Sequence, residues 1–447
     1  MIMSFQRIFV EELFILEKLV INGGNKLCGS VSIGGAKNAA VAILPATVLG
    51  EGVSVIHNIP NVKDVSLELR MLEEMGAKVR LIDKKTVEID TTHISSPIVS
   101  YELAKNMRAS YYFLGSLLAR MGTASVSMPG GCNFGVRPID QHIKGFELMG
   151  ATVEIENGMI NANAEQLIGT HIYFDVVSVG ATMNVMLAAC RAEGMTILEN
   201  VAKEPHIVDL ANYLNSMGAE IRGAGTDVIK IRGVKEMHGA DYTIIPDQIE
   251  AGTYMAAVAA TGGNAIIENV IPKHLESITA KLRSAGVMVE EGDDWVRVSR
   301  VGEINAINVA TMPHPGFPTD MQPQIAAMLL FANGTSIITE GVWDNRFKYI
   351  DELVRLGAKV VVDGKIAVIT GNAPLTAAPV KATDLRGGAA LVIAGLCING
   401  RTEIEEIKHI KRGYENIIEK LQGLGADIKI IDVPDDSIQG VIIPKQA

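Results

Sequence analysis

Met71-Leu72-Glu73-Glu74-Met75-Gly76-Ala77-Lys78-Val79 is the stretch from which the fold of this chain can be predicted. Its first part has the spacing of an amphipathic helix, and its last part begins a β-rich segment. Gly76 stands just past the last apolar turn, where helices commonly end in a left-handed conformation that costs glycine little. The stretch therefore predicts a unit made of a helix, a terminating glycine and a strand.

The same unit recurs five more times along the chain. Its six terminating glycines lie at intervals of about 70 residues, and a fixed period of this kind indicates repeated structural units. The later copies cover 147–153, 214–221, 282–287, 353–360 and 421–428, with Gly150, Gly218, Gly286, Gly357 and Gly425 as their glycines.

A helix that is apolar nearly all round precedes each of these units, and a glycine that opens a short β-branched run follows it. A helix with apolar residues on every face has to be buried. We therefore predict an α/β fold of six units, three in each of two domains, in which sheets cover interior helices. The apolar runs are 39–49, 111–119, 182–190, 254–260, 325–331 and 389–397, followed by Gly52, Gly122, Gly194, Gly263, Gly334 and Gly400.

Composition limits the classes of function. A chain of 447 residues exceeds what one hydrophobic core normally supports, which again favours two domains. The net charge of −11 argues against a general nucleic-acid or membrane-surface binder. No run approaches the about 18 apolar residues of a membrane span, and residues 1–17 lack the features of a secretory signal. Four distant cysteines without a CxxC pair favour a reducing compartment, so we expect a cytoplasmic protein.

The residues just before the apolar helices suggest a binding site. If the helices run alike within each domain, their N-termini gather on one face and offer free N–H groups to an anion. Lys37, Arg108 and Arg386 stand there, although a cation is disfavoured at a helix N-terminus unless an anion offsets it. The pattern predicts a cleft for a small polyanion, built from Lys37, Arg108, Arg137, Arg346, Arg386 and Arg412.

Each of these residues also has a simpler interpretation. A single arginine is more often a surface or ion-pair residue. Ser178 and Thr319 are candidate helix caps, and capping is equally the alternative to proton transfer or hydroxyl binding for Asp320 and Asp384.

A glycine-rich stretch, Pro129 to His142, is the strongest local signal for function. Gly130, Gly131 and Gly135 surround Cys132, and glycine at this density allows close backbone approach to a ligand. Cys132 is a candidate nucleophile or acid, since nearby cations lower the pKa of a thiol. The alternative is a flexible turn with an incidental thiol. Cys190 and Cys397 lie in apolar helical runs and are predicted to be inert core residues.

Other catalytic motifs are missing from the sequence. It contains no Walker A loop, no HExxH, no GxSxG and no Rossmann fingerprint after a strand. We therefore expect no P-loop, zincin, hydrolase or nicotinamide chemistry, and no spacing implies a cofactor or a metal.

From about Leu19 to near the C-terminus the sequence resembles the UDP-N-acetylglucosamine 1-carboxyvinyltransferases of the enolpyruvyl transferase family. The motifs that carry this resemblance occur in one order along the chain. They are Gly35-Ala36-Lys37-Asn38-Ala39-Ala40, Met107-Arg108-Ala109-Ser110, Pro129-Gly130-Gly131-Cys132, Arg137-Pro138-Ile139-Asp140, Ser178-Val179-Gly180-Ala181-Thr182, Pro318-Thr319-Asp320-Met321, Asn345-Arg346-Phe347, Ala382-Thr383-Asp384-Leu385-Arg386 and Arg412-Gly413-Tyr414-Glu415.

The resemblance implies two inside-out α/β domains, each a pseudo-threefold repeat, joined by two segments near residues 36 and 245. One domain would span 37–245 and carry the Cys132 loop, and the other would combine 18–36 with 246–447. Residues 1–17 have no counterpart in the family and are either a disordered tail or follow an upstream start.

The implied reaction moves the enolpyruvyl group of phosphoenolpyruvate to the 3′-hydroxyl of UDP-N-acetylglucosamine and releases phosphate, in peptidoglycan precursor synthesis. Lys37, Arg108, Arg137 and Arg412 would hold phosphoenolpyruvate or its phosphate. Cys132 would be the reactive loop cysteine, and Asp320 the base at the sugar hydroxyl. Asp384 and Arg386 would support the catalytic centre. The nucleotide-sugar site would be lined by Asn38, Arg137, Pro138, Ile139, Asp140, His142, Ser178, Val179, Gly180 and Val342.

Departures from the family pattern leave alternatives open. Val176 stands where some relatives have a lysine near the nucleotide phosphates, and Tyr112 replaces a tryptophan of some relatives. The rival functions are enolpyruvylshikimate-phosphate synthase, an inactive paralogue that binds nucleotide-sugars, and a structural scaffold. The first lacks the Gly-Gly-Cys loop, and the others leave the convergent cations unexplained. The expected assembly is a monomer or a weak homo-oligomer.

Overall fold

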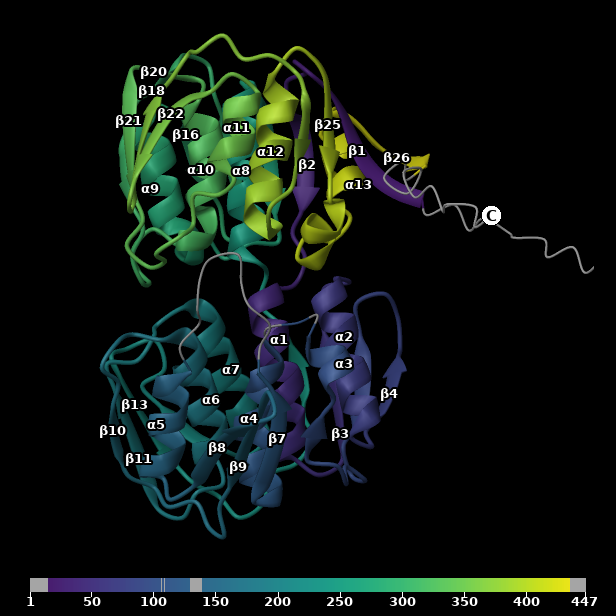
Figure 1. The fold of residues 1–447 in the computed structure, drawn as a ribbon, viewed down its shortest axis with the longest axis vertical. Helices are drawn as coiled ribbons and strands as arrows, with labels where there is room; N and C mark the ends of the chain where they lie inside the picture. The colour runs from purple at the N-terminus through teal and green to yellow at the C-terminus, as the bar shows by residue number, and fades with distance from the viewer. Residues whose placement is uncertain (1–14, 106, 108, 129–138, 435–447) are drawn as a thin grey trace, which may run out of the picture.

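Six helices with buried residues on nearly every side form the interior, as the apolar runs predict. The computed structural model describes residues 15–434 except 106, 108 and 129–138, and from Leu16 onward it also describes side chains. Figure 1 shows two lobes, and the interior helices lie within them. They are α1 (Lys37–Ala46), α4 (Tyr112–Met121) and α6 (Val179–Ala189) in the first lobe, and α8 (Gln248–Thr261), α10 (Gln322–Leu329) and α12 (Leu385–Cys397) in the second.

Six amphipathic helices lie outside the interior ones, one in each unit. Each is followed by its predicted glycine, and the six glycines have φ between 85° and 107°, the left-handed region that favours glycine. The helices are α2 (Lys63–Glu74), α5 (Asp140–Leu148), α7 (Pro205–Ser216), α9 (Glu276–Ser284), α11 (Ile350–Arg355) and α13 (Ile417–Gly423).

Three four-stranded sheets cover the first lobe, and all have one topology: a parallel pair followed by two antiparallel pairings. Their strands, in spatial order, are β14 (Asp241–Thr243), β3 (Val53–His57), β5 (Val87–Asp90) and β4 (Lys78–Leu81); β6 (Ile98–Val99), β7 (Thr123–Ser127), β9 (Met159–Asn163) and β8 (Thr152–Glu156); and β10 (His171–Tyr173), β11 (Met195–Glu199), β13 (Val228–Arg232) and β12 (Glu220–Arg222).

The second lobe repeats this topology three times, with β1 or β2 from the start of the chain completing two of its sheets. Its strands, in spatial order, are β2 (Cys28–Ser32), β15 (Asn264–Glu268), β17 (Trp295–Ser299) and β16 (Met288–Glu291); β19 (Asn308–Ala310), β21 (Thr335–Thr339), β23 (Ile366–Thr370) and β22 (Lys359–Asp363); and β24 (Pro379–Lys381), β25 (Gly400–Glu405), β1 (Ile15–Gly23) and β26 (Asp427–Pro434).

Short elements complete the described chain. They are the two-stranded sheet of β18 (Ile304–Asn305) and β20 (Ala332–Asn333), the helix α3 (Tyr101–Ala104), and the 3-10 helices η1 (Thr47–Leu49), η2 (Ala109–Tyr111), η3 (Pro272–Leu275), η4 (Thr319–Met321) and η5 (Ile407–Arg412).

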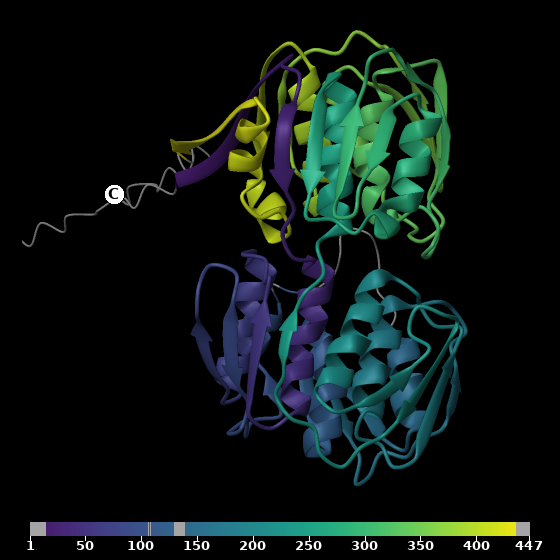
Figure 2. The same cartoon turned by 180° about the vertical axis from the view of Figure 1, so that it is seen from behind.

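Two segments connect the lobes, as Figure 2 shows from behind. The chain passes from β2 into α1 and returns from β14 into α8. The segments pair through a bridge between Gly35 and Pro246, and the Ala36 amide donates to the Ile245 carbonyl at 2.7 Å. Buried apolar residues form two clusters, one from Ala36 to Ile244 and the other from 19–33 and 249–428.

The start of the described chain differs from the expectation. Strand β1 begins at Ile15, and its residues 15–17 pair with 432–434 of β26. The resemblance leaves these three residues in the N-terminal extension, because no family motif covers them, but the backbone pairing places them in the sheet. Residues 1–14 lie outside the described part of the chain.

Gly115 lets two interior helices approach closely. A Cβ atom at this position would lie 2.2 Å from the backbone oxygen of Asn184 on α6. The buried Asn184 side chain accepts from the Gly115 amide at 2.8 Å and donates to the Tyr111 carbonyl at 2.8 Å. These contacts fix α4 against α6.

We predict that Gly115→Ala lowers the free energy of unfolding by about 3 kcal/mol, because the added methyl group has to push α6 away. Chemical denaturation measures the change. Gly423→Ala is the matched control, since nothing lies within 4 Å of a Cβ there and alanine favours a helix. Equal stability of the two variants would contradict the close packing of α4 and α6.

Candidate functional site

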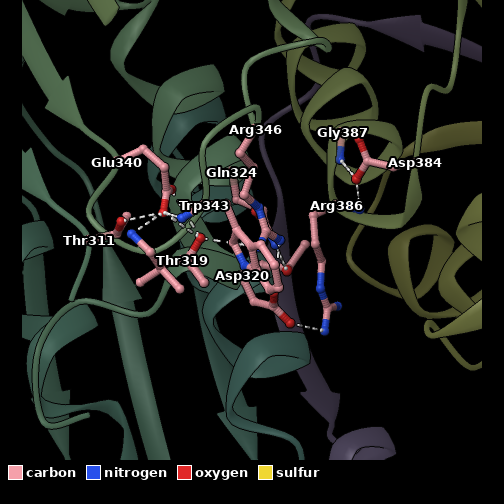
Figure 3. A network of polar contacts seen from close by, with 12 residues as sticks. Thr311, Thr319, Asp320, Gln324, Glu340, Trp343, Arg346, Asp384, Arg386 and Gly387 are labelled. Atoms are coloured by element: carbon pink, nitrogen blue, oxygen red, sulfur yellow. Dashed lines mark hydrogen bonds and ion pairs between the residues drawn. The ribbon is translucent and has the colours of Figure 1, made fainter. Parts of the chain in front are cut away.

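Asp320 joins two arginines that are distant in the sequence (Figure 3). Arg346 Nη2 donates to Asp320 Oδ1 at 2.8 Å, and Arg386 Nη2 donates to Oδ2 at 3.2 Å. The arginine side chains are 5% and 3% exposed, whereas that of Asp320 is 28% exposed. Two buried cations therefore present one partly open carboxylate.

The charges of the two arginines determine the protonation of Asp320. Burial by itself would raise the pKa of this carboxyl group, but the charges of Arg386 and Arg346 outweigh burial and hold the pKa well below its usual range. Asp320 is therefore an anion throughout the physiological pH range.

Glu340 holds residues next to the pair of Asp320 and Arg346 in place. Its carboxylate accepts hydrogen bonds from the hydroxyls of Thr311 and Thr319, at 2.8 and 3.0 Å, and from the amides of Val342 and Trp343. Thr319 in turn accepts from Arg346 Nη1 at 3.1 Å. Thr319 is thus a link between Glu340 and Arg346 rather than a helix cap.

A second charged cluster joins the two lobes. Lys37 Nζ lies 2.9 Å from Asp64 Oδ2, and Arg412 donates from Nε to Oδ1 at 2.9 Å and from Nη2 to Oδ2 at 3.2 Å. Lys37 begins α1 and Asp64 lies on α2, whereas Arg412 ends η5 of the second lobe. The Asp64 side chain is 3% exposed. Burial raises its pKa, but the charges of Lys37 and Arg412 reverse the shift and lower it.

Asp247 connects the starts of two interior helices. Its Oδ1 accepts from the amides of Ile249 and Glu250 and caps α8, while Oδ2 accepts from the Lys37 amide at 3.0 Å. The positive ends of α1 and α8 thus share one carboxylate. Lys37 also lowers the pKa of Asp320, so the two charged clusters act on each other through space.

The charges at the helix starts are offset within the protein. Asp64 neutralises part of the charge of Lys37, and Asp320 does the same for Arg386. These cations therefore do not by themselves require an anionic ligand, because carboxylates from other elements already supply anions.

The N-terminus of α6 forms a third region. Ser178 caps this helix, with its hydroxyl accepting from the Ala181 amide at 3.2 Å. A Cβ at Gly180 would lie 3.0 Å from His142 Nε2, so the absence of a side chain brings the helix close to the imidazole. His142 Nδ1 lies 3.0 Å from Asn184 Nδ2 and therefore accepts a hydrogen bond, which makes Nε2 the protonated nitrogen. Burial lowers the pKa of His142 to about 4, although nearby Asp140 opposes this shift.

The predicted site residues occupy several places. Lys37 and Arg412 bind the same carboxylate, that of Asp64. Asp320 binds Arg346 and Arg386. The Val342 amide donates to Glu340, which is linked to Arg346 through Thr319. Ser178, Val179 and Gly180 start α6, and Ile139 and Asp140 lie at the start of α5. Asn38 lies beside a shallow pocket that His206, Asp247 and His274 also line. Arg108, Cys132, Arg137 and Pro138 lie outside the described residues.

Asp384 fits the capping interpretation. Its Oδ1 accepts from the amides of Arg386 and Gly387 at 2.9 and 3.0 Å and caps α12 (Figure 3). It supports the site by fixing the helix turn from which Arg386 extends.

Asp64 and Glu340 belong to the site but are not among the residues predicted from the sequence. A signal for Asp64 existed, because Asp64 and Glu68 fall on the same helical face as Met71 and Leu72, which the apolar spacing assigns to the core. Glu340 follows a strand and left no comparable signal.

Cys190 and Cys397 agree with the prediction of inert thiols. Burial raises the pKa of Cys397 to about 12 and that of Cys190 further. Within the described ranges, no group of three or more His, Cys, Asp or Glu side chains is placed to hold a metal ion. Nor does any helix there have the length and apolar character needed to cross a bilayer.

Comparison with protein families gives a match along most of the chain. The model of the EPSP synthase (3-phosphoshikimate 1-carboxyvinyltransferase) family matches residues 21–421. UDP-N-acetylglucosamine 1-carboxyvinyltransferase 3 of Caldanaerobacter subterraneus is 58% identical over 92% of this chain and 99% of its own length. UDP-N-acetylglucosamine 1-carboxyvinyltransferase 2 of Clostridium acetobutylicum is 56% identical over 93% and 99%.

Solved structures share the fold. The enolpyruvyl transferase NikO of Streptomyces tendae superposes with a TM-score of 0.84 at 27% identity, covering 94% of this chain and all of its own. EPSP synthase of Acinetobacter baumannii superposes with a TM-score of 0.73 at 18% identity, covering 93% of this chain and all of its own, and it supports the fold alone. The α/β architecture of repeated units with buried helices, predicted from the repeats, is confirmed, as is the enolpyruvyl transferase fold that the resemblance implies.

We predict that His142 makes folding sensitive to acid. Its folded pKa of about 4 lies below the 6.5 of a free histidine, so the unfolded chain takes up the proton first and stability is lost as pH falls from 6.5 toward 4. Between about pH 7 and about pH 5 the wild type should lose about 2 kcal/mol more than His142→Gln in chemical denaturation. His171→Gln, at a side chain 58% exposed, is the control and should follow the wild type. An equal loss in His142→Gln would contradict a buried neutral imidazole.

Proposed function

Because the chain belongs to the EPSP synthase family of enolpyruvyl transferases, we propose that it transfers the enolpyruvyl group of phosphoenolpyruvate to the 3′-hydroxyl of UDP-N-acetylglucosamine and releases phosphate. The observation that carries this proposal is the 51–58% identity to UDP-N-acetylglucosamine 1-carboxyvinyltransferases over nearly the whole length of both chains. The protein would then act in the cytoplasm on precursors of the cell wall, and so contribute to cell shape and division. It would work as a monomer or weak homo-oligomer without a cofactor.

Lys37 and Arg412 are proposed to bind the phosphate of phosphoenolpyruvate. They approach from different lobes and share Asp64 as their carboxylate. A guanidinium and an ammonium group at this spacing suit an anion with several oxygens. Arg108 and Arg137, which lie outside the described residues, would complete the anion site. Substrate would take the place of Asp64 on part of these donors.

Asp320 is proposed to take the proton of the sugar hydroxyl. With its low pKa the carboxylate is a weak base toward a free hydroxyl group, whose pKa is far higher. Proton transfer would therefore come late, once the new C–O bond has made the hydroxyl strongly acidic. Arg346 and Arg386 hold both carboxylate oxygens and so fix the direction of that transfer.

The N-terminus of α6 and the nearby part of α5 are proposed to hold the nucleotide-sugar. Ser178, Val179 and Gly180 are partly exposed there, and free amides at a helix start suit a phosphate group. Asn38, Ile139, Asp140, His142 and Val342, together with Arg137 and Pro138, would complete this site. Val176 is 58% exposed on the approach to α6 and offers no charge to the diphosphate.

The reaction would proceed by addition and elimination. An acid protonates C-3 of phosphoenolpyruvate while the sugar oxygen attacks C-2 and Asp320 accepts the hydroxyl proton. The resulting tetrahedral adduct then loses a proton from C-3 and the C–O bond to phosphate breaks, which restores the double bond and frees phosphate. Cationic character at C-2 develops between anionic groups that the lysine and arginine side chains hold in place. Cys132 is proposed as the reactive loop cysteine for this centre.

The two core clusters are proposed to be the two domains, 37–245 and the combination of 18–36 with 246–447. The charged clusters lie where these parts meet, so closure of the domains would keep water from the adduct.

We predict that the purified protein releases phosphate from phosphoenolpyruvate only when UDP-N-acetylglucosamine is added. A coupled phosphate assay measures the release, and mass spectrometry should detect the enolpyruvyl ether of the nucleotide-sugar. Release with shikimate 3-phosphate but none with UDP-N-acetylglucosamine would contradict the proposal, as would tight nucleotide-sugar binding without turnover.

Arginine variants test whether the lobe-bridging cluster takes part. Arg412→Lys keeps the charge but loses the bidentate geometry and should lower kcat/KM by about 100-fold. Arg401→Lys is the matched control, since this arginine is 56% exposed and pairs with Glu403 on the surface. It should keep wild-type kinetics.

We predict that fosfomycin, an epoxide that reacts with thiolates, modifies Cys132 and inactivates the protein. Intact mass should rise by the mass of one adduct in the wild type. The same rise is expected in Cys28→Ala, the control that removes an exposed thiol. Cys132→Ala should show no adduct. An adduct that persists in Cys132→Ala would disprove the assignment of the reactive cysteine.

A further inference from the structure

Helix α2 carries two acidic residues on its buried face, next to the lobe-bridging cluster. Asp64 and Glu68 are four residues apart, so they lie one above the other on the same side of the helix. Both are buried, with 2% and 0% exposure. This face of α2 packs against α1, which begins with Lys37, and α2 also contacts η5, which ends with Arg412.

The two carboxyl groups differ in their hydrogen-bond partners. Asp64 takes all the ion pairs described above, whereas neither oxygen of Glu68 has a hydrogen-bond partner among the described residues. An ionised carboxylate buried in this way is strongly disfavoured, and the neutral acid costs much less. Burial raises the pKa of Glu68 well above its usual value, the charge of Asp64 raises it further, and Lys37 only partly opposes them.

The charged groups around Glu68 come from four elements besides its own. The groups that act on it directly are Asp64 on α2 and Lys37 on α1. Arg412 on η5 is bound to Asp64, and Lys411 on η5 binds Glu17. The other charged residues on the packed elements are Lys408 and His409 on η5, Lys78 and Arg80 on β4, and Glu102 on α3.

The protonation of Glu68 decides the net charge of this cluster. Lys37 and Arg412 contribute two positive charges, and Asp64 contributes one negative charge. With Glu68 neutral, one positive charge is in excess, and with Glu68 ionised, none is. We propose that Glu68 is a positioning residue that holds a proton and thereby leaves one net positive charge on Lys37 and Arg412 for the phosphate of the substrate.

This role rests on the proposed function and deepens it. Glu68 acts through Lys37 and touches no substrate. By linkage, binding of an anion to the two cations and retention of the proton on Glu68 favour each other. As pH rises and Glu68 ionises, the excess charge disappears and the anion is bound less tightly.

The test follows KM for phosphoenolpyruvate from about pH 6 to about pH 9 in the full-length protein, at saturating UDP-N-acetylglucosamine. Toward the alkaline end, KM of the wild type should rise about tenfold more than KM of Glu68→Gln, which mimics the neutral acid and cannot ionise. The ratio of their kcat values should stay constant, because the proton controls binding. Glu68→Asp keeps a titratable group and should retain the pH dependence. Glu73→Gln, at an exposed position of the same helix, should follow the wild type.

Two readouts remain informative if the protein lacks the proposed activity. Binding of inorganic phosphate, measured by calorimetry, should weaken with pH in the wild type and less in Glu68→Gln. The infrared difference between these proteins at neutral pH should show the carbonyl stretch of a protonated carboxylic acid, present in the wild type alone.

The absence of a carboxylic acid band at neutral pH would overturn the proposal, as would parallel pH profiles of the wild type and Glu68→Gln combined with loss of that band within the same pH range. If Glu68→Gln does not fold, the infrared difference between the wild type and Glu68→Asp, which moves the carboxylic acid to different surroundings, decides whether Glu68 carries the proton. Failure of phosphate release with an intact band would reject the proposed function while leaving the protonation of Glu68 established.

Discussion

The carboxylate of Asp64 holds Lys37 and Arg412 together, and this ionic bridge connects the two lobes at the centre of the candidate site. Its geometry is bidentate toward the arginine, with donor–acceptor distances of 2.9 and 3.2 Å, and the Asp64 side chain is only 3% exposed. Breaking a buried pair by removing one partner leaves an uncompensated charge, which is strongly unfavourable. Any ligand that binds these cations must therefore supply oxygen acceptors that replace those of Asp64.

The repeat architecture explains why charges gather at this place. Interior helices begin at the junction of the lobes, so their N–H groups and positive ends meet there. Asp247 serves α1 and α8 at once, Asp384 caps α12, and Asp320 binds the arginine of the first turn of α12. Carboxylates from distant parts of the chain thus offset the positive charge of these helix starts and of the arginine. The sheets that cover the interior helices leave these helix starts as a place where polar groups from several units meet.

Much of the fold could be predicted from the sequence, because it depends on local rules. A glycine past an apolar turn and a helix apolar on every face both have meaning without knowledge of the partners, and all six units follow from them. The pairing of β1 with β26 could not be predicted from such local rules, because it joins residues more than 400 positions apart. Residues 15–17 also carry no pattern of their own. The site divides in the same way. Lys37, Asp320 and Arg412 stand in motifs, whereas Asp64 and Glu340 act through contacts that only the folded chain creates.

Two acids one turn apart on α2 allow the lobe-bridging cluster to change its net charge as well as connect the lobes. A single carboxylate between two cations leaves a positive charge that attracts an anion, while a second ionised carboxylate would cancel it. The fold provides the second acid but denies it solvent and hydrogen-bond partners, which keeps its proton in place. The same burial that makes Glu68 unfavourable as an anion therefore preserves the charge of its neighbours. An exposed acid at this position would ionise, and Lys37 and Arg412 would then be fully neutralised by the protein before any substrate arrived.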